Sequence, residues 1–371
     1  MDNIYHKHKK SVLAIPDCSV VWDFARVDVD RGFPAETPHS DNVFHLKPSN
    51  LLYDYWESPV SVSCRDIPII KTGPFGHALF FDAESQFTNG DNQRTYLTLD
   101  RESFHDSPID CKGDQSFTFV VWVVKHISAS NHFIAGIWHE GTDLDDCRVV
   151  EAGKRQYAIF GGLRANPGGV AGHVSDTGGG TFGDTYARHL AVTEEKIAEY
   201  DFSDMLGKKP QNSETISAKL QSGRTSYENA WQCLAMQYDA EEKTVTAYLQ
   251  GRAKDHWVER PNDNPFYSHH LASFHQERDS FPACYTPPVK FVVSYKGKIT
   301  RLKVNPYWFG QRIYSPGEVP SGGPFTVGRA VSSFRNAGFT GLIGGVALFS
   351  RCLTQDELQQ LSTREFLRST L

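Results

Sequence analysis

Short runs of β-branched and aromatic residues recur along the whole chain and constrain its fold more than any other feature. Each run is bounded by Gly, Pro, Asn or Asp, as strands joined by turns are. The clearest runs are SVVWDFA (19–25), HALFFD (77–82), SFTFVVWVVKH (116–126), HFIAGIWHE (132–140), RQYAIFGGL (155–163), VAGHVS (170–175), CLAMQYDA (233–240), KTVTAYLQG (243–251), VKFVVSYKG (289–297), PFTVGRA (324–330) and LIGGVALFS (342–350). Many strands with few helices predict an all-β fold, an antiparallel sandwich or barrel.

Only two segments have a helical pattern. Residues 193–205 begin with a Thr followed by an acidic first turn, and residues 354–362 begin with Thr354 and carry Glu357 three residues later. The second spacing is that of a capping box, in which the two side chains satisfy the first amides of the helix. We expect Leu353, Leu358 and Leu361 to form its buried side.

Charge and hydropathy argue against two classes of partner. The 371 residues carry a net charge of −6, and no basic block longer than HKHKK (6–10) occurs, so we expect no nucleic acid partner. We assign that block to a flexible tail over residues 1–12. No apolar run approaches the ~20 residues of a membrane span, so we expect no membrane partner.

The seven cysteines and the N-terminus bear on localisation. No two cysteines have CxxC spacing, which favours scattered reduced thiols over a zinc or redox motif. Pro16 and Asp17 interrupt the first apolar run, so no signal-peptide core is present. Both features favour the cytoplasm, and secretion remains open if a leader has been removed from the chain.

The C-terminal segment FTVGRAVSSFRNAGFTGLIGGVALFSRCLTQDELQQL (325–361) carries a resemblance to a known fold family. A bend at Phe339 and Gly341, a strand over 342–349 and a turn and helix over 353–361 resemble the closing elements of the concanavalin A-like lectin/glucanase superfamily, in its laminin-G-like jelly-roll branch. Further pieces follow in the matching order: 19–25, 76–87, 116–123 and 236–251.

This resemblance implies one domain over residues 1–371 that handles carbohydrate. Its fold would be a jelly-roll β-sandwich with a short C-terminal helix, and the first and last strands would lie side by side to protect the sheet edges. The chain is longer than a bare module of this branch. We assign the excess to insertions at about 125–235 and 251–320, which enlarge the sheet or build loops around its concave face.

The stretch KRQYAIFGGLRANPGGVAGHVSDTGGGTFGD (154–184) places polar side chains between glycines. Side chains alternate between the two faces of a strand. If Ala158 and Phe160 enter the core, then Arg155, Tyr157 and Ile159 lie on the other face.

The same alternation applies to the following run, which we expect to be the neighbouring antiparallel strand. Val170 and Val174 would pack inward, and Ala171, His173 and Ser175 would point away from the core. Arg155, Tyr157 and His173 would then share one open face.

Such a trio on a concave face resembles the site of jelly-roll polysaccharide lyases, which act on uronic acid polymers by β-elimination. We assign His173 as the base, Tyr157 as the acid and Arg155 as the partner of the substrate carboxylate. Expected substrate-binding residues nearby are Tyr186, Arg188 and His189. The alternative is that these side chains form ordinary cross-strand pairs on a solvated face.

Two aromatic loops, NPFYSHHLASFH (264–275) and NPYWFGQRIYSPG (305–317), offer further contacts to sugar rings. We name Tyr267, His270, Trp308 and Arg312 as candidates, with packing over the sandwich edge as the alternative. The loop HEGTDLDDC (139–147) contains Glu140, Asp143, Asp145 and Asp146, which either bind calcium or are simply solvated. We expect that no cofactor is required.

A poly- or oligosaccharide is therefore the expected partner, and a polysaccharide lyase is the leading function. A non-catalytic lectin-like protein is the first alternative, because the aromatic loops alone would serve it. A glycoside hydrolase is the second, although the chain lacks the Glu-x-Asp-x-x-Glu spacing of the superfamily's retaining glucanases.

Overall fold

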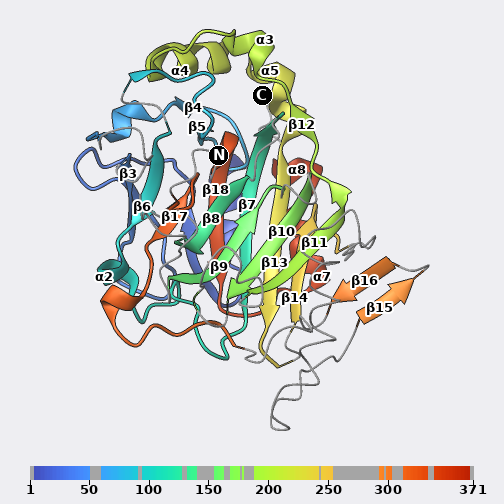
Figure 1. Cartoon of the computed structure of the whole chain (residues 1–371). Coiled ribbons are helices and arrows are strands. Elements are labelled where there is room, and N and C mark those ends of the chain that lie inside the picture. Colours follow the sequence, from blue (N-terminus) through green and yellow to red (C-terminus); the bar gives the residue numbers. More distant parts are fainter. Residues whose placement is uncertain are drawn as a thin grey trace.

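The computed structural model of the chain describes residues 4–50, 60–90, 94–127, 132–139, 154–162, 168–175, 178, 188–241, 244–253, 292–295, 298–302, 312–332 and 338–367. Within these ranges the chain forms two large β-sheets that share a hydrophobic core (Figure 1). The expected all-β sandwich is confirmed.

The first sheet is built around the two longest strands, which pair with each other along most of their length. Its order is β14 (Thr244–Leu249), β13 (Gln232–Asp239), β7 (Phe117–His126), β18 (Thr340–Phe349), β5 (Ala78–Asp82) and β4 (Ile69–Ile70). Two more strands join it: β1 (Cys18–Trp22) pairs with β18, and β12 (Glu199–Tyr200) pairs in parallel with β7. The expected contact between the first and last strands is therefore present.

The second sheet is antiparallel and draws its strands from distant parts of the chain. Its order is β11 (Arg188–Lys196), β10 (Gly169–Ser175), β9 (Arg155–Phe160), β8 (Phe133–Trp138), β17 (Phe325–Val327), β6 (Tyr96–Leu99), β3 (His45–Ser49) and β2 (Phe33–Pro34). The insertion expected at 125–235 thus supplies four strands of this sheet. A separate hairpin joins β15 (Val292–Tyr295) to β16 (Lys298–Leu302).

Strand β7 explains how the layers are held together, because it is buried on both faces. Phe119 and Val121 lie in the core between the two sheets, whereas Val120 and Trp122 lie in a second core on the outer side of the first sheet. A strand covered on both sides reads as a continuous apolar run, which is what FTFVVWVV shows.

Helices cover the outer face of the first sheet. They are α1 (Ile4–Leu13), α3 (Ser203–Leu206), α4 (Ser213–Ser222), α5 (Arg224–Tyr227), α7 (Gln355–Gln360) and α8 (Arg364–Leu367). Each of them contributes at least one side chain to the second core. Figure 1 shows α3, α4 and α5 grouped at one end of the molecule. The remaining short elements of the described ranges are α2 (Arg101–Phe104) and three 3₁₀ turns, η1 (Cys64–Asp66), η4 (Glu228–Ala230) and η5 (Val319–Ser321).

The capping box predicted at Thr354 is present at the start of α7. The Thr354 side chain accepts a hydrogen bond from the Glu357 amide, and the Glu357 carboxylate accepts from the Thr354 amide at 2.8 Å. Leu353, Leu358 and Leu361 are buried as expected.

Two expectations about local structure are wrong. The segment assigned to a flexible tail forms α1, whose His8 ring stacks on Phe366 at 4.6 Å between centroids and is held by the Pro74 carbonyl. The segment 193–205 contains the end of β11 and all of β12, and only its last residues are helical, in α3. In both cases tertiary contacts override a local pattern.

No helix in the described ranges is long and apolar enough to cross a bilayer.

The second core gives a direct test of the fold. Trp122 is fully buried, donates its indole N–H to the Leu361 carbonyl at 3.0 Å, and contacts Phe75 and Phe366. We expect Trp122→Ala to lower the free energy of unfolding by roughly 3–5 kcal/mol, measured by urea denaturation. Ile127→Ala, at a side chain that is 49% exposed, is the control. A Trp122→Ala protein as stable as the control would contradict this packing.

Candidate functional site

Strands β9 and β10 test the predicted catalytic face. They pair antiparallel, with Val174 opposite Tyr157 and His173 opposite Ala158. Val170 and Val174 lie in the core between the sheets, as expected. In strand β9, however, Tyr157 and Ile159 face the core between the sheets, whereas we expected Ala158 and Phe160 there.

Tyr157 lies between the two sheets and not on the outer face. It is fully buried with Ile159, its ring contacts Phe117 and Phe119, and its hydroxyl donates to the Ile109 carbonyl at 2.7 Å. Burial raises the pKa of this phenol well above its usual value. The expectation that Tyr157 points into an open groove, where it could act as a catalytic acid, is therefore wrong.

Arg155 and His173 do lie on the outer face of the second sheet, and both contact Trp138. The Arg155 guanidinium sits 5.1 Å from the Trp138 ring centroid, and the His173 ring lies 5.2 Å from the same ring and 4.7 Å from Phe160. Both side chains are nearly fully buried, at 3% and 2% exposure. The trio is thus divided between the two faces of the sheet.

The other predicted site residues are only partly placed. Arg312 is exposed beside Ile313, whose backbone pairs with Gly113. The backbones of Arg188 and His189 pair with Ser175 and Val174 in the second sheet. Residues outside the described ranges are Tyr186, Tyr267, His270 and Trp308, and the calcium candidates Glu140, Asp143, Asp145 and Asp146.

A polar hollow at the β2–β3 edge of the second sheet is the candidate site. It has a volume of about 660 Å³, within the roughly 300–1,000 Å³ typical of ligand sites. Two loops, strand β3 and helix α2 form its walls. The lining residues are Asp30, Arg31, Asp41, Asn42, Val43, Phe44, His45, Lys47, Leu99 and Ser103.

The first loop, residues 28–32, is a closed turn. The Asp28 carboxylate accepts hydrogen bonds from the amides of Asp30 and Arg31, both at 3.0 Å, and Asp28 and Gly32 exchange backbone hydrogen bonds. Gly32 has φ +104°, and a Cβ there would overlap the carbonyl oxygen of Leu46. Glycine is therefore required for the turn to lie against β3.

The second loop, residues 37–45, is held by its own side chains. The Thr37 hydroxyl donates to the carbonyls of Ser40 and Asn42 at 2.9 and 2.8 Å, and the Asn42 amide donates to the Ser40 hydroxyl. The Phe44 carbonyl accepts from the Ala35 amide at 2.8 Å. Both loops are thus fixed before any ligand arrives, which lowers the entropy cost of binding.

Strand β3 and α2 complete the wall with charge. Lys47 lies on the exposed side of β3, and its ammonium is 4.0 Å from the Asp100 carboxylate, just before α2. Ser103 on α2 is exposed to the hollow. Figure 1 shows β3, β6 and α2 together on one side of the molecule.

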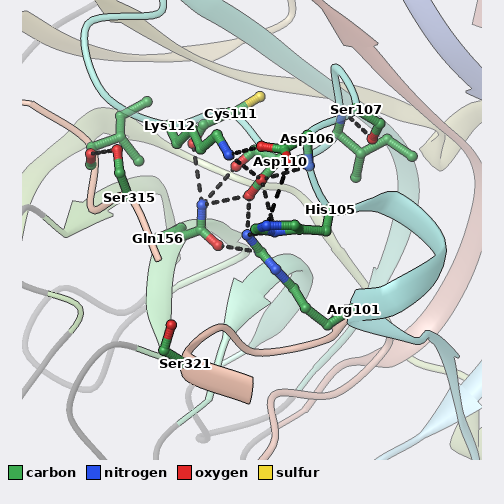
Figure 2. A network of polar contacts seen from close by, with 12 residues as sticks. Arg101, His105, Asp106, Ser107, Asp110, Cys111, Lys112, Gln156, Ser315 and Ser321 are labelled. Atoms are coloured by element: carbon green, nitrogen blue, oxygen red, sulfur yellow. Dashed lines mark hydrogen bonds and ion pairs between the residues drawn. The ribbon is translucent and has the colours of Figure 1, made fainter. Parts of the chain in front are cut away.

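Behind this wall, a buried ion-pair network fastens α2 to the second sheet (Figure 2). Arg101 reaches from α2 to the Asp110 carboxylate and to the Gln156 amide oxygen, and the Gln156 NH₂ group donates to the Asp110 carbonyl at 2.6 Å. Since Gln156 belongs to β9, the network locks α2 onto the middle of the sheet. Its side chains support the hollow without lining it.

The network also sets the protonation of Asp110. Burial acts to raise the pKa of this carboxyl, but hydrogen bonds from the Asp106 amide and the Gln156 side chain, with the nearby cations, hold the pKa below its usual value. Asp110 is therefore a carboxylate across the physiological range.

This network contains the one group of possible metal ligands among the described residues. Ligand atoms of His105, Asp106 and Asp110 lie within 4.8 Å of one another. Lys112 already contacts both carboxylates, with its ammonium 3.2 Å from Asp110. A metal would have to displace that lysine and approach the Arg101 guanidinium, so we propose no metal here.

The hollow has the chemistry to bind a polyhydroxylated ligand. The carboxylates of Asp30 and Asp41 are hydrogen-bond acceptors, and Arg31 and Lys47 are charged donors. The side-chain amide of Asn42 can both donate and accept. A sugar hydroxyl both donates and accepts, so such a mixed set suits it. The exposed Val43 side chain, 51% accessible, offers an apolar contact for ring C–H groups.

Two turn-rich segments of the sequence mark the loops of this site. DVDRG (28–32) and TPHSDN (37–42) are clusters of turn-forming residues between apolar positions, which is where fixed surface loops arise. Nothing in the sequence brings them together with Ser103, because β3 and β6 pair only in the folded sheet.

No protein-family model and no curated protein sequence matches the chain. Several solved structures are similar to it at low identity. Domain 4 of AbnA, an extracellular arabinanase from Geobacillus stearothermophilus in complex with arabinotriose, has a TM-score of 0.41 at 11% identity, covering 94% of this chain and 100% of that chain. The binding domain of Paraclostridial Mosquitocidal Protein 1 has a TM-score of 0.40 at 12% identity, covering 93% of this chain and 51% of that chain.

A third structure, the CBM40 domain of a Ruminococcus gnavus IT-sialidase bound to α2,6 sialyllactose, has a TM-score of 0.33 at 10% identity, covering 69% of this chain and 86% of that chain. The chain thus spans about half the length of the mosquitocidal binding domain. Likeness at this level establishes no common family, and the ligands of these domains are not transferred to this chain.

The Gly32 turn predicts a specific loss of stability. Gly32→Ala should lower the free energy of unfolding by more than Gly90→Ala, because both sites have positive φ but a Cβ at Gly90 meets no atom within 4 Å. Left-handed strain alone costs about 1–2 kcal/mol, and steric overlap adds to it only at Gly32. Equal losses in urea denaturation would show that the turn does not press on β3.

The network predicts sensitivity to acid. The pKa of Asp110 is lower in the folded than in the unfolded protein, where it is about 3.9. The ionised carboxylate therefore stabilises the fold above that value, and this stabilisation is lost as the pH falls through the lower, folded pKa. Asp110→Asn, which leaves Arg101 buried beside a neutral amide, should cost roughly 3–5 kcal/mol at neutral pH and flatten the acid slope of stability.

Asp106→Asn is the matched control, since that carboxylate is 69% exposed on the same loop. Chemical denaturation across the acid range measures both variants. Parallel pH profiles for wild type and Asp110→Asn would contradict the role of this carboxylate.

Proposed function

We propose that this protein is a non-catalytic carbohydrate-binding protein whose ligand, a short oligosaccharide, occupies the hollow at the β2–β3 edge. The observation that carries the proposal is the convergence of opposite charges and an amide on two loops that are already fixed by their own hydrogen bonds. Polar groups of this kind, placed on rigid loops, give orientation and specificity to a sugar.

Binding without catalysis is favoured over β-elimination by the arrangement of the expected trio. A lyase needs its base, its acid and its carboxylate partner on one accessible face. Here the Tyr157 phenol is bonded to a backbone carbonyl between the sheets, while Arg155 and His173 are buried on the other side of β9.

We further propose that the sandwich is a concanavalin A-like jelly roll. Two features support this assignment: β1 lies beside β18, and the capped helix α7 follows directly after that last strand. Both belong to the closing elements whose sequence resembles that superfamily.

A glycan array followed by calorimetry tests the proposed function. We expect the full chain to bind a defined oligosaccharide, and Asp41→Asn and Lys47→Ala to weaken binding roughly 10- to 100-fold each, since a hydrogen bond to a charged group is worth about 1.5–3 kcal/mol. The control is Asp204→Asn, at an exposed residue of α3 on the outer side of the first sheet, and it should bind like wild type.

Three results would overturn the proposal. They are absence of binding to any glycan, binding that both hollow variants retain, and appearance of unsaturated product when the wild-type chain is incubated with a uronic acid polymer.

A further inference from the structure

A second cavity, of about 280 Å³, lies on the helix-covered side of the first sheet and is not part of the proposed glycan site. Three segments converge on it: η4 with the residue that follows it, the residue after β14, and the turn between α7 and α8 together with α8 itself. The residues that matter are Glu228, Asn229, Trp231, Gln250, Ser362 and Arg364.

A fixed carboxylate forms the inner wall of this cavity. Glu228 is only 8% exposed, and its carboxylate accepts a hydrogen bond from the Thr72 hydroxyl at 2.9 Å. That hydroxyl in turn accepts from the Trp231 indole at 3.3 Å, and the Arg224 guanidinium lies 3.9 Å from the carboxylate. The negative charge is therefore held in one place, in a setting largely removed from water.

A guanidinium lies at the outer side of the same cavity. Arg364 is the first residue of α8 and is exposed. Two polar residues of the same lining are held in place: the Gln250 amide oxygen accepts from the Cys233 backbone at 3.1 Å, and the Ser362 hydroxyl donates to the Leu358 carbonyl at 2.7 Å. The cavity is thus lined by both a buried negative group and an exposed positive one.

We propose that this cavity binds a small zwitterion, a free α-amino acid, with its ammonium toward Glu228 and its carboxylate toward Arg364. A carboxylate is the natural partner of an ammonium, and a guanidinium pairs with a carboxylate through two parallel hydrogen bonds. The volume lies just below the roughly 300–1,000 Å³ of drug-sized sites, which matches one small molecule. A neutral sugar would bring no charge to either Glu228 or Arg364.

The test is a thermal-shift screen of the full chain against the common L-amino acids, with glucose and glucosamine as comparison probes. We expect at least one amino acid to raise the melting temperature in a saturable manner. Calorimetry with that amino acid should then show a loss of tenfold or more for Glu228→Gln and for Arg364→Ala. Arg65→Ala, at an exposed residue of η1, should leave the affinity unchanged.

Arg364→Ala keeps the test valid if Glu228→Gln fails to fold, because Arg364 is exposed. No stabilisation by any amino acid, equal or stronger binding of glucose or glucosamine, or affinity retained by Arg364→Ala would each overturn the proposal. The outcome is independent of the glycan site, since Lys47 lies on β3 of the other sheet and Asp41 lies on the loop that leads into β3.

Discussion

The apolar contact between the inner faces of the two sheets is the constraint on which the rest of this structure depends. On the first sheet, Phe119 and Val121 of β7 face this core. On the second sheet, Tyr157 and Phe325 face it, and both contact Phe119. Because that contact decides which face of each strand is buried, it also decides which polar side chains remain available. Arg155 and Tyr157 are two residues apart in the sequence and yet end on opposite faces of the second sheet.

The same constraint explains why the candidate site lies at the edge of the sheet. Where β2 and β3 end the second sheet, Phe33 and Leu46 pair inward and anchor the chain. The loops before and between these strands then project charged residues outward, and their own hydrogen bonds keep them in place. The buried pair of Arg101 and Asp110 fixes the neighbouring helix, so rigidity reaches the hollow from both sides.

The sequence predicted the scaffold well because its signals were local. Short apolar runs bounded by turn residues became strands, and the Thr354–Glu357 spacing became a capped helix. The face of β9 was not predictable in this way, since Tyr157 and Ile159 on one side are as apolar as Ala158 and Phe160 on the other. A register shift between β8 and β9, at Ile137 and Trp138, also breaks the regular alternation between Arg155 and Tyr157.

The α1 helix and the hollow were missed for a related reason: both depend on partners far away in the sequence. His8 docks on Phe366, and the loops at 28–45 meet α2 only through the pairing of β3 with β6. Polar and aromatic residues at such positions have no periodic signature, whereas strands do.

Hydrogen–deuterium exchange of the full chain, with and without a saturating amount of the oligosaccharide selected on the array, tests the central claim most directly. We predict slower exchange of backbone amides in residues 28–32 and 40–47, with β9 and β10 unchanged. Slower exchange confined to residues 154–175, with no change in the two loops, would contradict it and return the site to the strands where Arg155 and His173 lie.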